Sequence, residues 1–357
     1  MPNIPVPVLE AVCAETFERV GCSREEALRV ARSLIGANLA GHDSHGVIRV
    51  PRYVDWVKSG DIVPNQTIAM LVDTPALAVI DGRYGFGQTV APQAVRIGVA
   101  KAQAAGLAAV SLRDAGHIGR VGEWAEMVAA EGLVSIHFVN ASGSILVAPF
   151  GGAERRLSTA PFCVGIPREK AEAVILDFAT SIVAEGKVMV ASQGGKTLPA
   201  GALIGPDGEL STDPAQLYGP LVEGGPRDST KGRGAIRAFG EHKGSGLAFM
   251  CEILGGSLTG TKATHVGRKK FANGMFSIYV DPKRIDPEHV FDADVGRYIA
   301  YFKSAKPVKG VKEVLVPGEP ERAMRAERMK NGAPLSDETW GAICGAAKRV
   351  GASAPKV

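Results

Sequence analysis

Residues 41–46 read Gly-His-Asp-Ser-His-Gly and place two histidines three positions apart. Histidine titrates near neutrality and can donate or accept a proton, and Ser44 beside His45 could hydrogen bond the reacting oxygen or the imidazole. Arg49 follows four positions after His45, and a guanidinium can hold a carboxylate through two parallel hydrogen bonds. These residue types suit proton transfer to a substrate with a carboxylate. A helix cap formed by Asp43 or Ser44 explains the segment equally well.

Two histidines with an acid between them could instead hold a metal ion. A zinc site needs three or four ligands, and the chain offers no spaced cluster of such residues. We therefore predict no metal. The five cysteines are widely separated, which indicates reduced thiols in a cytoplasmic protein, with a catalytic thiol as a minor alternative.

Residues 116–122 read Gly-His-Ile-Gly-Arg-Val-Gly and lie between an expected strand and an expected helix. Three glycines let backbone N–H groups approach a phosphate at a helix start, and Arg120 could add positive charge. A glycine-rich turn with a solvated arginine explains the pattern equally well.

Three further segments carry polar residues at the ends of expected elements. Asp177 follows a buried strand, where it could orient a histidine or hold a ribose, and a helix cap is the alternative. Residues 240–244, Gly-Glu-His-Lys-Gly, open a helix and place positive charge where a helix start already favours an anion. Residues 316–319 form a turn into a helix near the chain end.

A standard dinucleotide-binding fingerprint is not found. The nearest match, Gly-Phe-Gly-Gln-Thr-Val at residues 85–90, lacks the third glycine of G-x-G-x-x-G. No acidic residue ends a second strand about twenty residues later, as a ribose contact requires. The sequence thus argues against a Rossmann site.

Helices are expected to position the histidine segment. Apolar residues recur at helical spacing over 8–20 and 27–40, and Ser23 with Glu26 forms a capping box before the second of these helices. This second helix leads directly into residues 41–46. A short helix over 50–59, ending at a glycine, is expected to follow.

The middle of the chain has the pattern of an α/β fold. We expect buried strands, the helices between them, an extended loop region and two helices near the end. The strands are 77–81, 108–112, 134–139, 174–177 and 275–280; the helices are 88–104, 121–131 and 244–255; the loop is 198–231; the last helices are 319–331 and 336–350. We predict a helical lobe from both chain ends, residues 1–75 and 300–357, beside an α/β lobe of residues 76–299.

Composition excludes several classes of protein. The chain has 357 residues, 45% hydrophobic and 22% charged, which is typical of a globular protein. The net charge is only +4, with 41 basic residues interspersed among 37 acidic ones, so no nucleic acid is expected as a partner. No signal peptide and no apolar run of about 18 residues is present, so we expect no membrane association.

Five motifs occur together in one order along the chain, at residues 39–46, 116–120, 148–152, 176–181 and 241–244. In this order and spacing the chain resembles the malate/L-lactate dehydrogenase-like oxidoreductases over nearly its whole length. Residues 133–139 and 241–259 look closest to the hydroxycarboxylate dehydrogenase B group. The resemblance implies a non-Rossmann α/β lobe that binds NAD or NADP and a homodimer whose active site lies between lobes.

The resemblance also implies roles for particular residues. His45 matches the proton donor of relatives, with Ser44 beside it, and His117 matches the residue that has the acid/base role in others. Substrate binding is expected from Arg49 and Thr159, although Ala160 replaces the asparagine usual after that threonine, which puts substrate assumptions from the family in doubt. The residues expected at the cofactor are His45, Gly119, Arg120, Val121, Ile175, Leu176, Asp177, Phe178, Ala179, His242, Lys243, Asn273, Gly318, Glu319, Pro320 and Glu321.

The predicted reaction is hydride transfer between the nicotinamide C4 and C2 of a 2-oxo acid, of the lactate, malate or aryl-lactate type. His45 would protonate the developing alkoxide, Arg49 would hold the carboxylate, and Asp177 would orient the histidine. Reduction of a cyclic imine such as piperideine-2-carboxylate is the alternative within enzymes. A metabolite-binding protein that has kept the fold is the alternative outside them.

Overall fold

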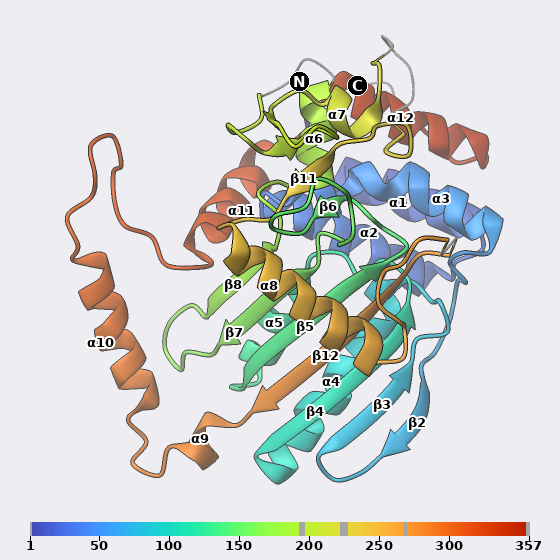
Figure 1. Cartoon of the computed structure of the whole chain (residues 1–357). Helices are drawn as coiled ribbons and strands as arrows, with labels where there is room; N and C mark the ends of the chain where they lie inside the picture. Colours follow the sequence, from blue (N-terminus) through green and yellow to red (C-terminus); the bar gives the residue numbers. More distant parts are fainter. Residues whose placement is uncertain (1, 193–196, 222–227, 268–269, 355–357) are drawn as a thin grey trace.

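The computed structural model describes residues 2–192, 197–221, 228–267 and 270–354. Its centre is a seven-stranded sheet in the order β2-β3-β4-β12-β5-β7-β8, in which only the β3–β4 pair is parallel (Figure 1). The strands are β2 (Ala69–Asp73), β3 (Leu77–Asp81), β4 (Leu107–Ala115), β5 (Val134–Ser142), β7 (Pro161–Ile166), β8 (Val174–Ala179) and β12 (Ala272–Val280).

All five expected strands are present. The bounds of β3 are the predicted ones, and the other four strands extend by one to three residues at one or both ends beyond the apolar runs. The predictions missed β2 and β7. β2 is largely exposed at the sheet edge, so its side chains do not alternate in burial as a strand with one buried face would.

Helices cover both faces of the sheet. On one face α4 (Gly87–Ala105) and α5 (Val121–Ala130) bury an apolar cluster with the strands. On the other, α8 (His242–Cys251) continues as a π-helical segment, η3 (Glu252–Leu258), against β5 and β12. A Cβ at Gly274 of β12 would lie 1.9 Å from the carbonyl oxygen of Gly255, so this contact is between backbones. The expected helix 244–255 therefore begins earlier and changes type.

A second apolar cluster joins the two ends of the chain. It packs α1 (Val6–Arg19), α2 (Arg24–Leu39) and α3 (Val50–Ser59) with α12 (Asp337–Arg349), while β1 (Asn3–Ile4) pairs with β13 (Ala333–Pro334). The expected bounds of α3 and of α11 (Glu319–Asn331) agree with the structure.

Only one arm of the predicted capping box forms. Ser23 accepts from the N–H of Glu26 (Oγ–N 3.2 Å) and caps α2 as expected. The Glu26 carboxylate does not return to Ser23. It is buried and accepts from Thr89 Oγ1 and from the N–H of Asn65, so it joins α2 to α4 and to the segment before β2.

A third apolar cluster lies where a long loop was expected. Residues 198–231 contribute two short strands and a helix, and the four-stranded sheet runs β10-β9-β11-β6. Its elements are β6 (Val147–Ala148), β9 (Leu203–Ile204), β10 (Leu210–Ser211) and β11 (Ala235–Arg237), with α6 (Glu185–Ser192) and α7 (Ala215–Tyr218) beside it. Part of the expected loop, residues 222–227, lies outside the described residues.

One helix that was not expected stands away from the body. α10 (Phe291–Lys303) follows the short α9 (Pro282–Ile285), and both have no buried residue (Figure 1). No helix of the described ranges is both long enough and apolar enough to cross a membrane. The division into lobes at residues 75 and 300 stays a prediction, although the central sheet already begins before residue 75, with β2.

Candidate active site

The turn that carries His45 is fixed by one asparagine. After α2 the chain forms two successive 3₁₀ turns, and the side chain of Asn38 spans them. Its Nδ2 donates to Asp43 Oδ1 (2.7 Å) and its Oδ1 accepts from the N–H of Val47 (2.7 Å). A Cβ at Gly46 would lie 2.1 Å from Asn38 Oδ1, so this close approach requires glycine.

The explanation of this segment as a helix cap is wrong. No side chain caps the start of α3, which follows Arg49. No side chain caps either of the preceding 3₁₀ turns. Asp43 instead forms an ion pair with Arg328 of α11 (Oδ1–Nη1 2.6 Å), which draws the histidine turn toward the other end of the chain.

The structure brings the two candidate histidines into contact. His45 Nδ1 lies 3.3 Å from His117 Nε2, and the two rings are nearly parallel with centroids 5.3 Å apart. The Tyr53 hydroxyl lies 2.6 Å from His117 Nδ1, and Gln88 Nε2 donates to Tyr53 Oη (3.0 Å). Four side chains from separate segments therefore form one hydrogen-bonded chain that ends at His45.

The direction of this chain follows from its amide end. Because Gln88 donates to Tyr53 Oη, the tyrosine can donate its own proton to His117 Nδ1. His117 then carries its proton on Nε2 and donates to His45 Nδ1. His45 is left with a proton on Nε2, the nitrogen that does not face His117. Burial raises the pKa of Tyr53, which keeps the phenol protonated.

Both histidines are held in the neutral form. Burial, followed by the positive charge of Arg49, lowers the pKa of His45 to about 3. The same two causes, in the same order, lower the pKa of His117 well below its ordinary value. The pair is consequently a hydrogen-bonding and proton-relaying unit rather than a fixed positive charge at neutral pH.

Arg49 is oriented by the backbone and keeps its outer donors available. Its Nε donates to the carbonyl oxygen of Ser44 (2.6 Å). Within the described part of the chain neither Nη atom has a hydrogen-bond partner, and the residue is partly exposed. An arginine held in this way can bind a carboxylate through both Nη groups. The geometry therefore suits the predicted carboxylate-binding role.

Asp177 contacts the start of α5 and not His45. Its Oδ2 accepts from the N–H of Gly122 (2.7 Å). Burial raises the pKa of this carboxyl, while the charges of His42 and Arg120 act to lower it. The expectation that Asp177 orients the ring of His45 is thus not supported, because His117 occupies that position.

Arg120 is neither a solvated arginine nor a free phosphate ligand. It is 3% exposed and forms an ion pair with Glu126 (Nη2–Oε1 2.7 Å). The side chain of Arg120 is paired, whereas the backbone N–H groups beside it are not. The N–H groups of Gly119, Arg120 and Val121 donate no hydrogen bond to any described residue, although all three residues are buried. Unpaired buried N–H groups at the start of α5 suit an anionic ligand such as a pyrophosphate.

The side chain of Asn273 supports the loop that carries His117 and Ile118. Its Oδ1 accepts from the N–H of Ile118 (3.0 Å) and its Nδ2 donates to the carbonyl oxygen of Asn140 (2.6 Å). The residue is 4% exposed, and both ends of its amide are occupied by protein groups. The side chain thus positions the loop of His117, since Ile118 follows His117 directly, and a contact between Asn273 and the cofactor stays a prediction.

The turn before α11 lies against the start of β8. The N–H of Ile175 donates to the carbonyl oxygen of Pro317 (3.3 Å). Glu321 on the first turn of α11 approaches His42 (Oε1–Nε2 3.5 Å), whereas Glu319 forms an ion pair with Lys303 (Oε1–Nζ 2.6 Å) and turns toward α10. The expected cofactor residues of β8, α5 and α11 therefore lie around one place, although Glu319 itself points away from it.

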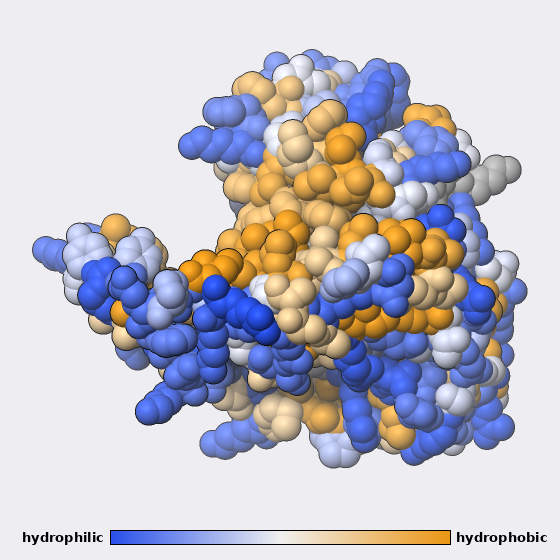
Figure 2. Space-filling view, turned by 90° about the horizontal axis from the view of Figure 1, so that it is seen from below, coloured by the Kyte–Doolittle hydropathy of each residue, from blue (hydrophilic) through white to orange (hydrophobic). Residues whose placement is uncertain are grey.

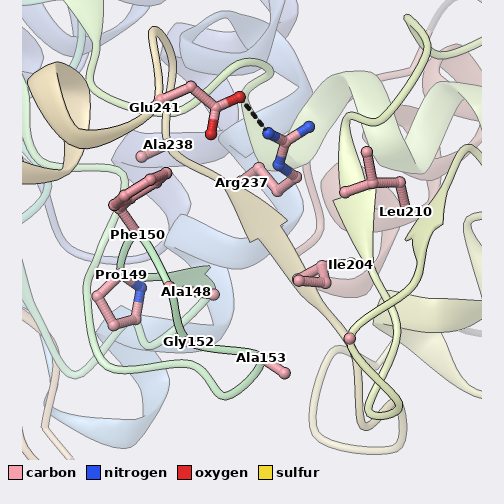
Figure 3. Close-up of a pocket in the computed structure, with 12 residues that line it drawn as sticks. Ala148, Pro149, Phe150, Gly152, Ala153, Ile204, Leu210, Arg237, Ala238 and Glu241 are labelled. Atoms are coloured by element: carbon pink, nitrogen blue, oxygen red, sulfur yellow. Dashed lines mark hydrogen bonds and ion pairs between the residues drawn. The ribbon is translucent and has the colours of Figure 1, made fainter.

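His242 and Lys243 lie in a more open region. Both are exposed at the start of α8, and the His242 ring contacts Phe150 with centroids 6.0 Å apart. A pocket of about 290 Å³ lies next to them, lined by residues 148–153 and by Arg237 and Glu241, which form an ion pair across it (Figure 3). No described contact joins this region to His45.

Thr159 belongs to a loop that a buried carboxylate holds. Its carbonyl oxygen accepts from the N–H of Thr180 (3.1 Å), next to the end of β8. Glu252 of the π-helical segment accepts from Ser158 Oγ (2.6 Å). Ala160, at the position where relatives have asparagine, is fully buried. The substitution thus places an apolar side chain in the protein interior, and Thr159 stays a predicted substrate contact.

Sequence reasoning missed Tyr53, Gln88 and Phe271. Tyr53 lies one helical turn after Arg49, and this i to i+4 spacing was a signal that could have been used. Gln88 and Phe271 gave no local signal. The Phe271 ring reaches the His117 ring (centroids 6.1 Å apart) only because β12 crosses the sheet beside the histidine loop.

Comparison with known proteins gives the family. The model of the malate/L-lactate dehydrogenase family matches residues 4–344. The chain belongs to this family. It is 40% identical to hydroxycarboxylate dehydrogenase B of Escherichia coli (strain K12) over 349 residues, which cover 96% of this chain and 93% of that protein.

Solved structures agree with this assignment. An E. coli protein assigned to the malate/lactate dehydrogenases superposes with a TM-score of 0.90 at 39% identity, covering 99% of this chain and 96% of that one. The delta1-piperideine-2-carboxylate reductase of Pseudomonas syringae pvar. tomato superposes with a TM-score of 0.79 at 27% identity, covering 97% and 100%. The predicted resemblance is confirmed, and the chain is an oxidoreductase of the hydroxy-acid dehydrogenase kind.

The described side chains can be examined for a metal site. Among the described residues no three His, Cys, Asp or Glu side chains lie close enough to hold one ion. His45 and His42 are instead engaged with His117 and Glu321.

Proposed function

We propose that the protein interconverts a 2-oxo acid and a 2-hydroxy acid by hydride transfer with NAD or NADP. The observation that carries this proposal is the chain from Gln88 through Tyr53 and His117 to His45, which lies close to an arginine with free Nη donors. Such a chain can supply a proton to a carbonyl oxygen while the arginine holds the adjacent carboxylate.

His45 is the proton donor in this reading. Its Nε2–H hydrogen bonds the carbonyl oxygen of the substrate and passes the proton over as negative charge develops there. The proton comes from solvent, because reduction of an oxo acid by NADH or NADPH consumes one proton per turnover. A substrate carboxylate on Arg49 offsets the positive charge that lowers the pKa of His45, so His45 can take up this proton and return to the neutral form when it passes a proton on. His117 holds His45 Nδ1 by a hydrogen bond, and Tyr53 holds His117. Asn273 fixes the loop of His117 by accepting a hydrogen bond from the N–H of Ile118. His117 is then the second member of the relay, and His45 is the residue that contacts substrate.

The nicotinamide supplies the hydride when it is bound, and the chain offers a place for its phosphates outside a Rossmann fold. The free N–H groups of residues 119–121 fit a pyrophosphate, and β8 with the turn at Gly318 lies beside them. Asp177, exposed in part and hydrogen bonded to Gly122, is well placed for a ribose hydroxyl. The pair His242 and Lys243 is the proposed site for a more distant part of the cofactor.

We also propose that the protein acts as a homodimer. α8 and η3 expose several large apolar side chains, namely Phe249 (55% exposed), Met250 (50%), Ile253 (39%) and Leu258 (58%). Figure 2 shows apolar residues gathered in the hollow between the projecting α10 and the rest of the molecule. An exposed apolar face of this kind is typical of a subunit interface. A monomer of 37.3 kDa in sedimentation analysis would contradict this proposal.

A second candidate reaction is reduction of a cyclic imino acid, which the similarity to the piperideine-2-carboxylate reductase favours. The same histidine and arginine would serve an imine carbon next to a carboxylate. Oxidation of NADH and of NADPH should be followed with pyruvate, oxaloacetate, phenylpyruvate and piperideine-2-carboxylate. Turnover of an oxo acid supports the main proposal, and turnover of the imine alone replaces it. No turnover with any of them favours a metabolite-binding protein.

A further inference from the structure

A buried carboxylate outside the histidine pair is left without a role by the proposed reaction. Glu252 is the first residue of the π-helical segment η3 and is 4% exposed. Within the described ranges it forms no ion pair with a Lys, Arg or His side chain. Glutamate is rarely buried without a paired charge, so hydrogen-bond donors must stabilise this carboxylate.

Both oxygens of the Glu252 carboxylate accept hydrogen bonds. Oε1 accepts from Ser158 Oγ (2.6 Å), from the N–H of Ser158 (3.3 Å) and from Thr264 Oγ1 (3.1 Å). Oε2 accepts from the N–H of Thr264 (2.9 Å) and from Asn140 Nδ2 (3.4 Å). Because each oxygen faces a backbone N–H group, the NH₂ of a glutamine here would face a donor in either orientation. The site therefore requires a carboxylate.

One group of donors connects Glu252 to the loop of Thr159. Ser158 gives its hydroxyl proton to Glu252, and Ser158 Oγ accepts from the N–H of Ala160 (3.2 Å). The carbonyl oxygens of Thr159 and Ala160 both accept from Thr180 Oγ1, next to the end of β8. The carboxylate thus fixes the residue that directly precedes Thr159.

The other donor connects Glu252 to the loop of His117. Asn140 of β5 donates from its side chain to Glu252, and its carbonyl oxygen accepts from Asn273 Nδ2 (2.6 Å). Asn273 Oδ1 accepts from the N–H of Ile118 (3.0 Å), and Ile118 follows His117. Three hydrogen bonds and the backbone of Asn140 therefore join the carboxylate to the histidine loop.

Two glycines bring η3 close enough to β5 for this connection. A Cβ at Gly256 would lie 2.5 Å from Asn140 Nδ2, and a Cβ at Gly255 would lie 2.7 Å from the backbone nitrogen of Asn140. Both distances are too short for a real side chain, so these positions require glycine. The π-helical turn that contains them is of a kind often found at functional sites.

We propose that Glu252 is a positioning residue for the reaction, whose carboxylate holds the loop of Thr159 and the loop of His117 in a fixed relation to each other. Glu252 acts through these loops and is not a catalytic residue. A small displacement of a reacting or binding group costs a large factor in rate. This inference rests on the proposed function, because that function gives His117 its place beside the acid and Thr159 its predicted substrate contact.

The first test is Glu252→Gln, which keeps the shape of the side chain and turns one acceptor into a donor. Reduction of pyruvate, oxaloacetate and phenylpyruvate is followed at saturating NADH and NADPH. We expect kcat to fall by about 10- to 100-fold, the scale of one hydrogen bond to a charged group. Ile343→Ala is the control for lost stability, because it removes a fully buried side chain from the cluster of the chain ends. It should lower the melting temperature and leave kcat near that of the wild type.

A double variant separates positioning from a general loss of stability. Asn273→Ala breaks the connection between Glu252 and Ile118, so adding Glu252→Gln to it should reduce kcat by less than about threefold. The remaining effect should be on the KM for the oxo acid, through the loop of Thr159. Fully additive losses of kcat would overturn the proposal.

Two hydroxyl variants test the same carboxylate if Glu252→Gln does not fold. Ser158→Ala and Thr264→Val each remove one donor to Oε1, but only Ser158 adjoins Thr159. Ser158→Ala should raise the KM for the oxo acid about 10-fold, and Thr264→Val should keep wild-type kinetics. Wild-type kcat in folded Glu252→Gln, or equal kinetics in the two hydroxyl variants, overturns the proposal. No turnover of any oxo acid by the wild type would instead count against the proposed function.

Discussion

Two regions that sequence motifs marked as functional differ in how firmly the fold holds them. The His45–His117 region is enclosed, and Asn38, Asn273 and Tyr53 fix its backbone and rings by hydrogen bonds of 2.6–3.0 Å. The region around residues 148–153 and 241–243 is open, and its main polar contact is the ion pair between Arg237 and Glu241. Phe150 there is 58% exposed.

The difference indicates that the two regions have different roles. Proton transfer requires donors and acceptors that are already within hydrogen-bond distance, and the first region provides this before any ligand binds. Binding a flexible part of a cofactor does not require such order. We infer that chemistry belongs to the first region and that the second contributes binding only.

The largest expected effect is at the end of the relay. His45→Ala should reduce kcat by about 10²- to 10⁴-fold, because general acid catalysis contributes on that scale. Binding of NADH or NADPH, followed by its fluorescence, should persist. His265→Gln, an exposed histidine far along the chain, is the control and should keep normal turnover. Turnover of His45→Ala close to that of the wild type would remove His45 from the chemistry.

Acid should destabilise the first region next most strongly. The pKa of His45 is lowered to about 3 in the folded protein, so the unfolded chain binds more protons between pH 6.5 and about 3. The stabilisation from neutral histidine is full above pH 6.5 and is lost as pH falls, by about 1.4 kcal/mol per pH unit for each such histidine. Urea unfolding at pH 7, 6 and 5 measures this slope.

A matched variant assigns that slope. His117→Gln removes a second histidine whose pKa is lowered, and it should make the free energy of unfolding less dependent on pH. His265→Gln should leave the dependence as it is. If the wild type and both variants showed the same slope, His117 would not be held in the neutral form as the structure indicates.

A smaller effect is expected one step behind the histidines. Tyr53→Phe keeps the ring packing with Phe17 and Phe86 but removes the hydroxyl that bonds to His117. We expect kcat to fall by about 10-fold, corresponding to about 1.4 kcal/mol, which is the usual worth of one hydrogen bond. Tyr298→Phe on the exposed α10 is the control. A loss as great as that of His45→Ala would make Tyr53 an acid in its own right.

The smallest effect belongs to the open region. Glu241→Gln breaks an ion pair in which Glu241 is 57% exposed, and exposed pairs contribute about 0–1 kcal/mol. The melting temperature and kcat should therefore stay close to those of the wild type, while the KM for the cofactor is free to change. A fall of kcat by more than about 10-fold with unchanged KM would place chemistry in this region and end the comparison.

Local chemistry in the sequence determined the elements and the first histidine. Helix periodicity and a final glycine gave the bounds of α3, and Ser23 gave the start of α2, because these signals act between residues a few positions apart. The same local patterns marked the segment with His42, His45 and Arg49, and the other family motifs singled out His45 as the acid. Local patterns left the function of that turn undecided until the other family motifs were included.

Only the tertiary structure decided which groups meet. The contact between Tyr53 and His117 spans 64 positions and that between Asn273 and Ile118 spans 155, so no local pattern encodes them. Asp177 was expected at His45 and instead accepts a hydrogen bond from Gly122, 55 positions away, at the start of α5. Residue types specify what each side chain can do, whereas the packing of helices on the sheet selects its partner.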